Sequence, residues 1–292
     1  MGGGTWTTSS FASYSATKGY NVDCATGALD GTYSSQEMYT QRHIHQDLKP
    51  YNIVRECVDS AEHPETIPVI LALDVTGSMG KAAVEVAKQL NVIMTDLYAR
   101  VKDIEFCVMG IGDLSYDQHP IQMSQFESDI RIAEHMDKVY FEYGGGGNSF
   151  ESYTAAWYMG SRHTKLDCWN RGKKGIIITM GDEQLNPYLP ARKLSVDTGD
   201  TLQGDIETSD LYPEVTEKFD VYHIDVNHRG YRDNGITPSW KKYMDDDHYK
   251  SVSLNAVKDT IVDMIVHAMG DASPEVAEEN TIQQNENGEI VW

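Results

Sequence analysis

The sequence predicts an α/β fold: a doubly wound, mostly parallel sheet of six strands with helices on both faces. An apolar run at residues 67–73, interrupted only by Pro68, is typical of a strand buried on both faces of a parallel sheet. Apolar residues then recur every three or four positions as far as Val101, which predicts an amphipathic helix. Similar apolar runs return at residues 104–111 and 175–181, so strands and helices alternate along the chain.

The turn between the first apolar strand and its helix carries three oxygen-bearing side chains at alternating positions, Asp74, Thr76 and Ser78. In open α/β sheets, ligands bind at the carboxyl edge of the strands. One carboxylate and two hydroxyls suit Mg²⁺, which prefers oxygen ligands and keeps several waters. The alternative is that Thr76 or Ser78 simply caps the following helix. This turn alone leaves both interpretations open.

The pattern Asp74-x-Thr76-x-Ser78-x-Gly80 resembles the metal-ion-dependent adhesion site of von Willebrand factor A (VWA) domains. The resemblance extends over about residues 67–270. It implies a Rossmann-like VWA fold holding Mg²⁺, or Mn²⁺ or Ca²⁺, that bridges to an Asp or Glu carboxylate of a partner protein. Bacterial and phage members of the cytoplasmic type often accompany MoxR-type AAA+ ATPases, so the resemblance also implies such an ATPase as partner.

The 292 residues suit one large α/β domain with appendages. We expect a VWA-like domain at residues 49–270, a polar N-terminal arm at 1–48, and an acidic, polar C-terminal tail at 271–292. The arm shows no clear periodicity, so it is expected to be loosely structured, with short strands near Tyr14 and Tyr33 and either docked or disordered. The tail is expected to be disordered or to form a short partner-binding peptide.

The net charge of −21 argues against a nucleic-acid surface, which requires a basic patch. No apolar run reaches the roughly 18–20 residues of a membrane span, and no signal-like segment opens the chain. Four widely spaced cysteines form no Cys-x-x-Cys pair, and Cys107 lies in an apolar strand pattern typical of the core. Together these features predict a cytoplasmic protein that binds neither nucleic acid nor membrane.

A second buried strand is predicted at residues 104–111, ending beside Asp113. The resemblance implies that residues 121–126 pair with it as an antiparallel hairpin strand. On that basis we expect Asp113 on the rim opposite Asp74, although it remains a candidate for the metal shell. A short amphipathic helix is predicted at residues 130–138.

Four glycines at residues 144–147 precede a predicted apolar helix that includes residues 155–158. Glycines before a helix can cradle a phosphate, but no Gly-Lys-Ser/Thr follows, which disfavours a nucleotide loop. The resemblance implies that this is the second metal loop, in which a Thr ligand usually follows the glycines. Here Asn148 or Ser149 must take its place, and the choice stays open. Glu151 is expected in the first turn of the helix or as an outer-shell acceptor.

The apolar strand at residues 175–181 ends at Asp182. The resemblance implies that this is the third metal loop, with Asp182 holding the ion directly or through water. Three strand-end loops that all carry oxygen ligands are hard to explain as unrelated helix caps, which favours a metal site. The predicted metal residues are Asp74, Thr76, Ser78, Asn148, Ser149 and Asp182.

The rest of the chain follows the same alternation of elements. We predict, in order, an irregular excursion near the metal edge at 186–210, a short helix at 214–218, a strand at 219–226 with His223 in the core, a helix at 240–246, an edge strand at 249–253, and a last helix capped by Asn255 and ended by Gly270.

The sequence favours a binding module over an enzyme. A Mg²⁺-dependent phosphohydrolase of the haloacid dehalogenase kind also starts from a strand-end aspartate, but it uses Asp-x-Asp, with the second carboxylate as acid/base. Thr76 occupies that second position here, so the general acid is missing. A structural subunit of a phage or bacterial assembly would share the binding chemistry and remains an alternative.

Overall fold

The computed structural model describes residues 4–143, 147–227 and 235–270. The strands of the central sheet are β2 (Ile67–Asp74), β3 (Ile104–Ile111), β4 (Ile121–Met123), β7 (Gly175–Gly181), β11 (Phe219–Val226) and β12 (Tyr249–Val252). They lie in the order β12-β11-β7-β2-β3-β4, and of these six strands only β4 runs antiparallel to its neighbour. The predicted doubly wound, mostly parallel six-stranded sheet is confirmed.

The central position of β2 follows from its composition. It pairs in parallel with β3 on one side and β7 on the other, so that Leu71 lies opposite both Val108 and Ile178. Every residue of the strand except Ile67 is buried. A continuous apolar run is what a strand covered on both faces requires, because neither set of alternating side chains meets water.

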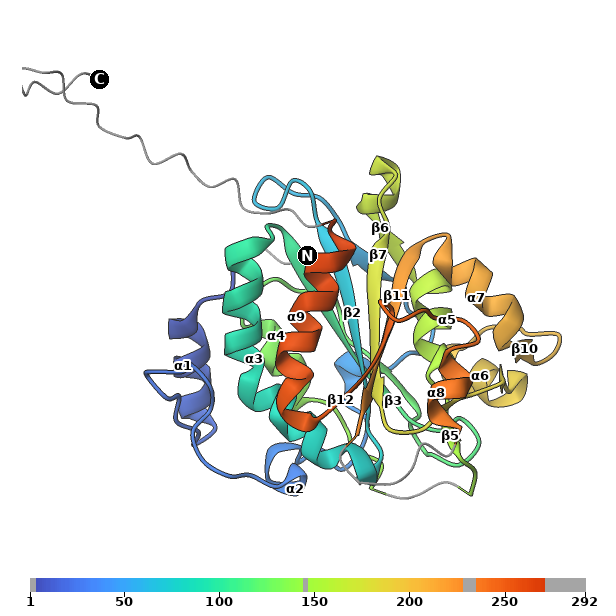
Figure 1. Cartoon of the computed structure of the whole chain (residues 1–292), viewed down its shortest axis with the longest axis horizontal. Helices are drawn as coiled ribbons and strands as arrows, with labels where there is room; N and C mark the ends of the chain where they lie inside the picture. The colour runs from blue at the N-terminus through green and yellow to red at the C-terminus, as the bar shows by residue number, and fades with distance from the viewer. Residues whose placement is uncertain (1–3, 144–146, 228–234, 271–292) are drawn as a thin grey trace, which may run out of the picture.

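Helices cover both faces of the sheet (Figure 1). One face carries α3 (Gly80–Arg100), α4 (Arg131–Asp137) and α9 (Val257–Ala268), and the other carries α5 (Thr154–Arg162), α6 (Ala191–Thr198), α7 (Thr208–Thr216) and α8 (Ile236–Trp240). The predicted helices at 130–138 and around 155–158 are therefore confirmed as α4 and α5.

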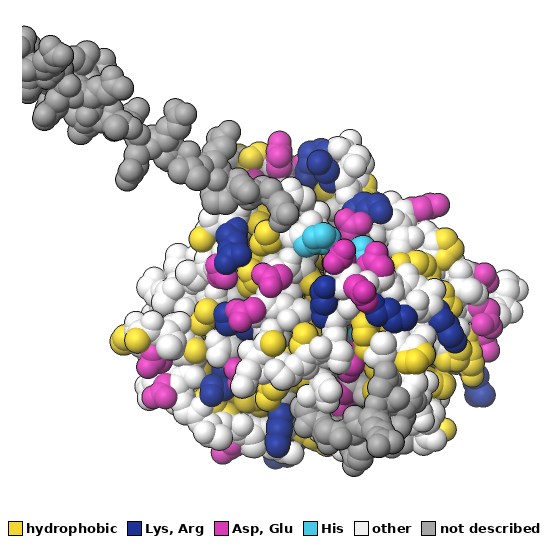
Figure 2. All heavy atoms as spheres, in the orientation of Figure 1, with side chains coloured by type: hydrophobic (Ala, Val, Ile, Leu, Met, Phe, Trp, Pro, Cys, Tyr) yellow, Lys and Arg dark blue, Asp and Glu magenta, His cyan; other side chains and the backbone are white. Residues whose placement is uncertain are grey.

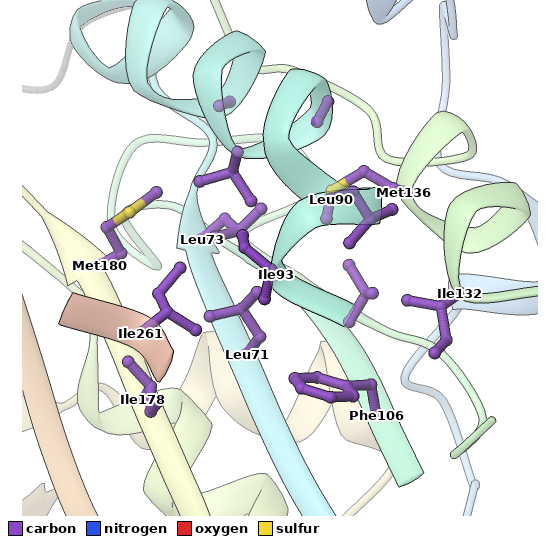
Figure 3. Packing of buried hydrophobic residues seen from close by; sticks show 14 of the residues in the cluster. Leu71, Leu73, Leu90, Ile93, Phe106, Ile132, Met136, Ile178, Met180 and Ile261 are labelled. Carbon is purple, nitrogen blue, oxygen red and sulfur yellow. The ribbon is translucent and has the colours of Figure 1, made fainter. Parts of the chain in front are cut away.

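Two hydrophobic clusters fill the space between the sheet and the two helical layers. Leu71 and Leu73 of β2 belong to the α3–α9 side, whereas Ile70 and Ala72 belong to the α5 side, as the alternation along a strand requires. Figure 3 shows the first cluster, in which β2 side chains point toward residues of other strands and helices, including Ile93, Ile178 and Ile261.

Six further short strands form three pairs outside the main sheet, each two or three residues long. They are β1 (Arg55–Cys57) with β6 (Thr164–Leu166), β5 (Phe150–Glu151) with β8 (Gln184–Leu185), and β9 (Tyr188–Leu189) with β10 (Ile206–Glu207). Single turns of 3₁₀ helix are η1 (Gln46–Leu48), η2 (Gly77–Met79), η3 (Asp167–Arg171) and η4 (Leu254–Ala256).

The N-terminal segment contains helices rather than the short strands predicted near Tyr14 and Tyr33. Tyr14 lies within α1 (Thr8–Thr17), which Thr7 caps by accepting a hydrogen bond from the Ser10 amide. Tyr33 stands before α2 (Ser35–Met38), and that helix starts with a capping box. Local hydrogen bonds at these helix starts therefore favour helices in a segment whose sequence shows no clear periodicity.

The same segment packs against α3 and shares its hydrophobic cluster. Trp6 is only 6% exposed, and its indole N–H donates to Asn91 Oδ1 at 2.9 Å. The Tyr39 hydroxyl donates to the Ala83 carbonyl at 2.9 Å. Of the two predicted states of the arm, its described part thus adopts the docked one. The domain boundaries at 48/49 and 270/271 remain predictions, and the tail at 271–292 lies outside the described residues.

Several predictions for the C-terminal half need correction. The region 186–210 is not irregular, because it holds α6 and the β9–β10 pair. The helix predicted at 214–218 begins earlier, at Thr208, because α7 accommodates Pro213 in its interior instead of starting after it. The helix expected at 240–246 is α8, which ends at Trp240.

The last helix also starts differently from the prediction. Asn255 lies within η4 rather than capping α9, whose cap residue is Ala256 and has no side-chain cap hydrogen bond. Gly270 follows the helix with a φ of 72°, the left-handed conformation that ends many helices, as predicted. The edge strand β12 and the fully buried His223 are confirmed.

Three of the four cysteines are buried in the fold. Cys57, Cys107 and Cys168 are buried and Cys24 is exposed, all four as free thiols. On the face shown in Figure 2, Lys and Arg side chains are interspersed with Asp and Glu, without a continuous basic area. Among the helices in the described ranges, none is long and apolar enough to cross a membrane.

Candidate functional site

Three parallel strands bring acidic residues to one edge of the sheet. Asp74 ends β2, Asp113 follows β3 and Asp182 follows β7, and the three strands run in the same direction. The expectation that Asp113 lies on the opposite rim is therefore wrong. The end of β3 is fixed by its own parallel pairing with β2, and the antiparallel β4 only returns from that end.

Asp74 starts a chain of oxygen atoms that links two of these loops. Its Oδ1 accepts from the Thr76 amide at 2.8 Å and from Thr76 Oγ1 at 2.6 Å. Thr76 Oγ1 lies 3.1 Å from Ser78 Oγ, which donates to Asp182 Oδ1 at 2.9 Å. The fold thus brings together four of the six predicted site residues, and we call Asp74, Thr76, Ser78 and Asp182 the oxygen cluster.

The two hydroxyls of the oxygen cluster do not cap the following helix. Thr76 precedes η2 but makes no side-chain cap hydrogen bond, and the cap residue of α3 is Met79. Both hydroxyls instead contact carboxylates. Helix capping therefore does not explain Thr76 and Ser78. Their hydroxyls serve to bind the carboxylates or an ion.

Tyr153 is a site residue that the sequence did not reveal. It stands just before α5, is fully buried, and its hydroxyl donates to Asp74 Oδ2 at 2.9 Å. The same hydroxyl accepts from the Glu183 amide at 3.3 Å, so it joins the second and third loops. The only sequence signal was its place beside the glycine-rich loop, because a tyrosine there fits an ordinary buried aromatic equally well.

Glu151 lies behind this cluster. It belongs to β5, which pairs with β8, and so it is not in the first turn of α5 as one of the two expectations placed it. The residue is 7% exposed, and its buried Oε2 has no hydrogen-bond partner among the described residues. Burial, followed by the nearby charge of Asp74, raises the pKa of this carboxyl well above its usual range.

Asn148 and Ser149 are near the edge but do not join the oxygen cluster. The Asn148 amide donates to Asp113 Oδ2 at 2.6 Å. The Ser149 backbone carbonyl accepts from the Gln184 amide at 3.3 Å. Neither side chain hydrogen-bonds to the oxygen cluster in the part of the chain that is described, and Gly144–Gly146 of this loop lie outside it. A metal contact by either residue stays a prediction.

Asp74 is an acid buried without a counter-charge among its described neighbours. It has no exposed surface, and its contacts are the Thr76 amide and hydroxyl and the Tyr153 hydroxyl. Burial, and then the negative charge of Asp182, raise its pKa to about 7, although the hydrogen bonds from Thr76 and Tyr153 oppose this. A buried ionised carboxylate is costly unless a cation pairs with it.

The donor atoms fit a hard divalent cation, with one restriction. The oxygen cluster offers two carboxylates and two hydroxyls, which suit Mg²⁺, Mn²⁺ or Ca²⁺ better than zinc. No group of three or more His, Cys, Asp and Glu residues is placed to hold a metal ion within the described ranges. An ion here would therefore depend on the Thr76 and Ser78 hydroxyls as well as on the two carboxylates.

Comparison with known proteins gives only distant similarity. No protein-family model matches the chain, and no curated protein matches it. The pilus adhesin SpaC from Lactobacillus rhamnosus GG is 11% identical over 86% of this chain, with a TM-score of 0.45, and this chain covers 35% of SpaC. The vWF domain of the type V pili tip protein Mfa5 from Porphyromonas gingivalis is 9% identical over 70% of this chain and 95% of that domain, with a TM-score of 0.43. The order and direction of the strands define the fold of this chain without these similarities.

Proposed function

We propose that this protein is a metal-dependent protein-binding module. The oxygen cluster would hold Mg²⁺, or Mn²⁺ or Ca²⁺, and an Asp or Glu of a partner protein would complete the shell of the ion. The observation that carries this proposal is Asp74, a fully buried acid whose described contacts are hydroxyls and an amide and include no cationic side chain.

The ligand types support a bridging ion rather than a closed structural site. Thr76 and Ser78 are neutral, so the oxygen cluster gives a divalent cation no more than two negative charges. A carboxylate of a partner can therefore join the ligands of the ion. Among the described residues of the turn, the outermost ones are accessible to a partner. Gly77 at the tip of the turn is exposed and Ser78 is half-buried, whereas Asp74 lies beneath them. A partner would therefore approach across the turn.

The same geometry gives no support to the phosphohydrolase alternative. Thr76 stands two residues after Asp74, and its hydroxyl donates to Asp74 Oδ1 instead of providing a carboxylic acid. Both oxygens of Asp74 accept hydrogen bonds from fixed groups, which holds the carboxylate as a ligand rather than freeing it to attack. We therefore propose a binding role, which a subunit of a phage or bacterial assembly could equally use.

Replacing Ser78 by Ala tests the metal site. This change removes one neutral ligand without disturbing a buried apolar group, and we expect Mg²⁺ affinity to fall about 10- to 100-fold, as for other losses of coordination support. Isothermal titration calorimetry of the metal-free protein measures it, with Ser195→Ala on α6 as a matched control. Equal Mg²⁺ affinity in Ser78→Ala and Ser195→Ala would contradict the proposal, as would a wild type that binds no divalent ion.

The partner is proposed to be a MoxR-type AAA+ ATPase, met in the cytoplasm. An affinity pull-down from native lysate with Mg²⁺ or with EDTA tests this, because a carboxylate bound to the ion must dissociate when the ion is removed. We expect an AAA+ ATPase among the proteins captured with Mg²⁺ and lost with EDTA, and also lost from Ser78→Ala. Capture of such an ATPase that is equal in Mg²⁺ and EDTA would exclude binding through the metal.

A further inference from the structure

A groove opens beside the oxygen cluster, between the N-terminal segment and the start of α3. Its volume is about 660 Å³, one wall is formed by residues 32–37, and the other runs from Gly77 and Ser78 to Val84. Figure 1 shows α2 lying next to the first turns of α3. Gly80 contributes to the floor, where a Cβ atom would lie 2.7 Å from Ser35 Oγ. The groove therefore begins at a proposed metal ligand, Ser78, and leads away from it.

The groove holds one acidic and one basic side chain, and the acidic one is already hydrogen-bonded within the N-terminal segment. Glu37 is its one acidic residue, and this carboxylate already accepts from the Ser34 amide and hydroxyl, each at 2.7 Å. These two hydrogen bonds hold the pKa of Glu37 below its usual range. Lys81 is exposed and makes no ion pair with any described residue. Its ammonium group is thus available on the groove wall, one turn beyond Ser78.

We propose that the groove binds an extended acidic segment of the partner protein, in which two acidic residues are separated by one other residue. This inference rests on the proposed function. The first acidic side chain would reach the ion at the oxygen cluster, and the second would pair with Lys81.

The distance between the proposed ion at Ser78 and the Lys81 ammonium group matches the spacing of acidic side chains in such a segment. Ser78 and Lys81 are three residues apart in the continuous turn formed by η2 and α3, which places their Cβ atoms roughly 5–6 Å apart. Alternate side chains of an extended peptide lie on one face, roughly 6.6–6.8 Å apart. The long, flexible Lys81 side chain can close the remaining difference. Thr32 lines the facing wall, where its hydroxyl can bond the peptide backbone.

Fluorescence anisotropy with three labelled peptides tests this inference. Each has eight residues, with Asp-Ala-Asp, Asp-Ala-Ala or Ala-Ala-Ala in the centre and Gly and Ser around it, in buffer with Mg²⁺ or EDTA. We expect wild type with Mg²⁺ to bind the Asp-Ala-Asp peptide about three- to tenfold more tightly than Asp-Ala-Ala, the range for a partly exposed ion pair of good geometry. Ala-Ala-Ala should not bind measurably.

Variants of Lys81 assign that preference to the groove. In Lys81→Ala the two Asp peptides should bind equally, and in Lys81→Glu the Asp-Ala-Asp peptide should bind less tightly than Asp-Ala-Ala. Lys102→Ala is the matched control, because Lys102 is an exposed lysine just before β3, at the opposite edge of the sheet. It should bind all peptides as wild type does.

The outcomes separate this inference from the proposed function. The groove inference would be overturned if wild type bound the two Asp peptides equally, or if Lys81→Ala weakened both alike. In either case, peptide binding that EDTA abolishes would still support the metal site. Peptide binding that survives EDTA would overturn the metal-dependent function, and with it the assignment of the first acidic residue to the ion.

Discussion

Asp74→Asn is expected to abolish Mg²⁺ binding and to leave the metal-free protein at pH 8 at least as stable as wild type. An amide keeps the size of the side chain and one oxygen to accept from Thr76, but it cannot neutralise a divalent ion. It also removes a negative charge that is fully buried and whose hydrogen bonds with the described residues come from hydroxyls and an amide. Denaturant unfolding in EDTA and in saturating Mg²⁺ measures both effects.

The pH dependence of this difference has a definite sign. The folded-state pKa of Asp74 is raised to about 7, above its ordinary value of 3.8. Below the ordinary value the acid is protonated whether the chain is folded or unfolded. As pH rises toward about 7 the unfolded chain releases this proton more readily, so metal-free wild type loses more stability through that window than Asp74→Asn does. At about 1.4 kcal/mol per pKa unit, the total loss is of the order of 4 kcal/mol.

Mg²⁺ should reverse that loss in wild type, because the ion takes the place of the proton. The stabilisation by a hundredfold excess over the dissociation constant is about 2.7 kcal/mol. The dissociation constant itself should fall from pH 5 to pH 8. Asp263→Asn, an exposed change on α9, is the control and should follow wild type throughout. If Mg²⁺ stabilised wild type and Asp74→Asn equally, the assignment of Asp74 as a ligand would be refuted.

The sequence was sufficient for the sheet and for part of the site because both depend on local patterns. The apolar runs of β2, β3 and β7 identify buried parallel strands, and parallel strands necessarily end at one edge. The positions of Asp74 and Asp182 at strand ends agree with the resemblance, which implied that the two residues belong to one site. The expected antiparallel pairing of β4 with β3 is confirmed, but it does not move Asp113 to the other rim, because the parallel pairing of β3 with β2 fixes where β3 ends.

The residues that were missed are those whose role depends on contacts distant in sequence. Tyr153 becomes part of the site only because the ends of β2 and β7 meet its hydroxyl. Glu151 was named from the sequence, but its burial without a described hydrogen-bond partner for Oε2 depends on the same packing, which no local pattern records. The N-terminal segment is intermediate. Its capping box, with Ser34 and Glu37, is readable in the sequence, whereas the docking of Trp6 on Asn91 is not.

Gly181→Ala is expected to destabilise the fold by about 1–3 kcal/mol or more and to weaken Mg²⁺ binding at least tenfold. A Cβ atom at this position would lie 1.9 Å from the Tyr153 hydroxyl oxygen and 2.4 Å from Cζ. The Tyr153 ring cannot simply turn away, because it is fully buried against His223 and Trp240. Overpacking of this kind forces side chains and backbone to shift. Chemical denaturation and calorimetric Mg²⁺ titration measure the two effects.

The metal effect should arise through Tyr153, since the methyl group at position 181 would drive its hydroxyl away from Asp74 Oδ2. Tyr153→Leu creates room for the methyl group, so the double variant Gly181→Ala/Tyr153→Leu should lose less stability than the sum of the two single changes. Gly204→Ala is the control, because no atom lies within 4 Å of the added Cβ. If Gly181→Ala were as mild as Gly204→Ala, Tyr153 would be free to move and could not be what holds Asp74 in position. The double variant could instead lose less stability than the sum while Gly181→Ala keeps the Mg²⁺ affinity of wild type. Tyr153 would then support the fold of the loop without orienting Asp74.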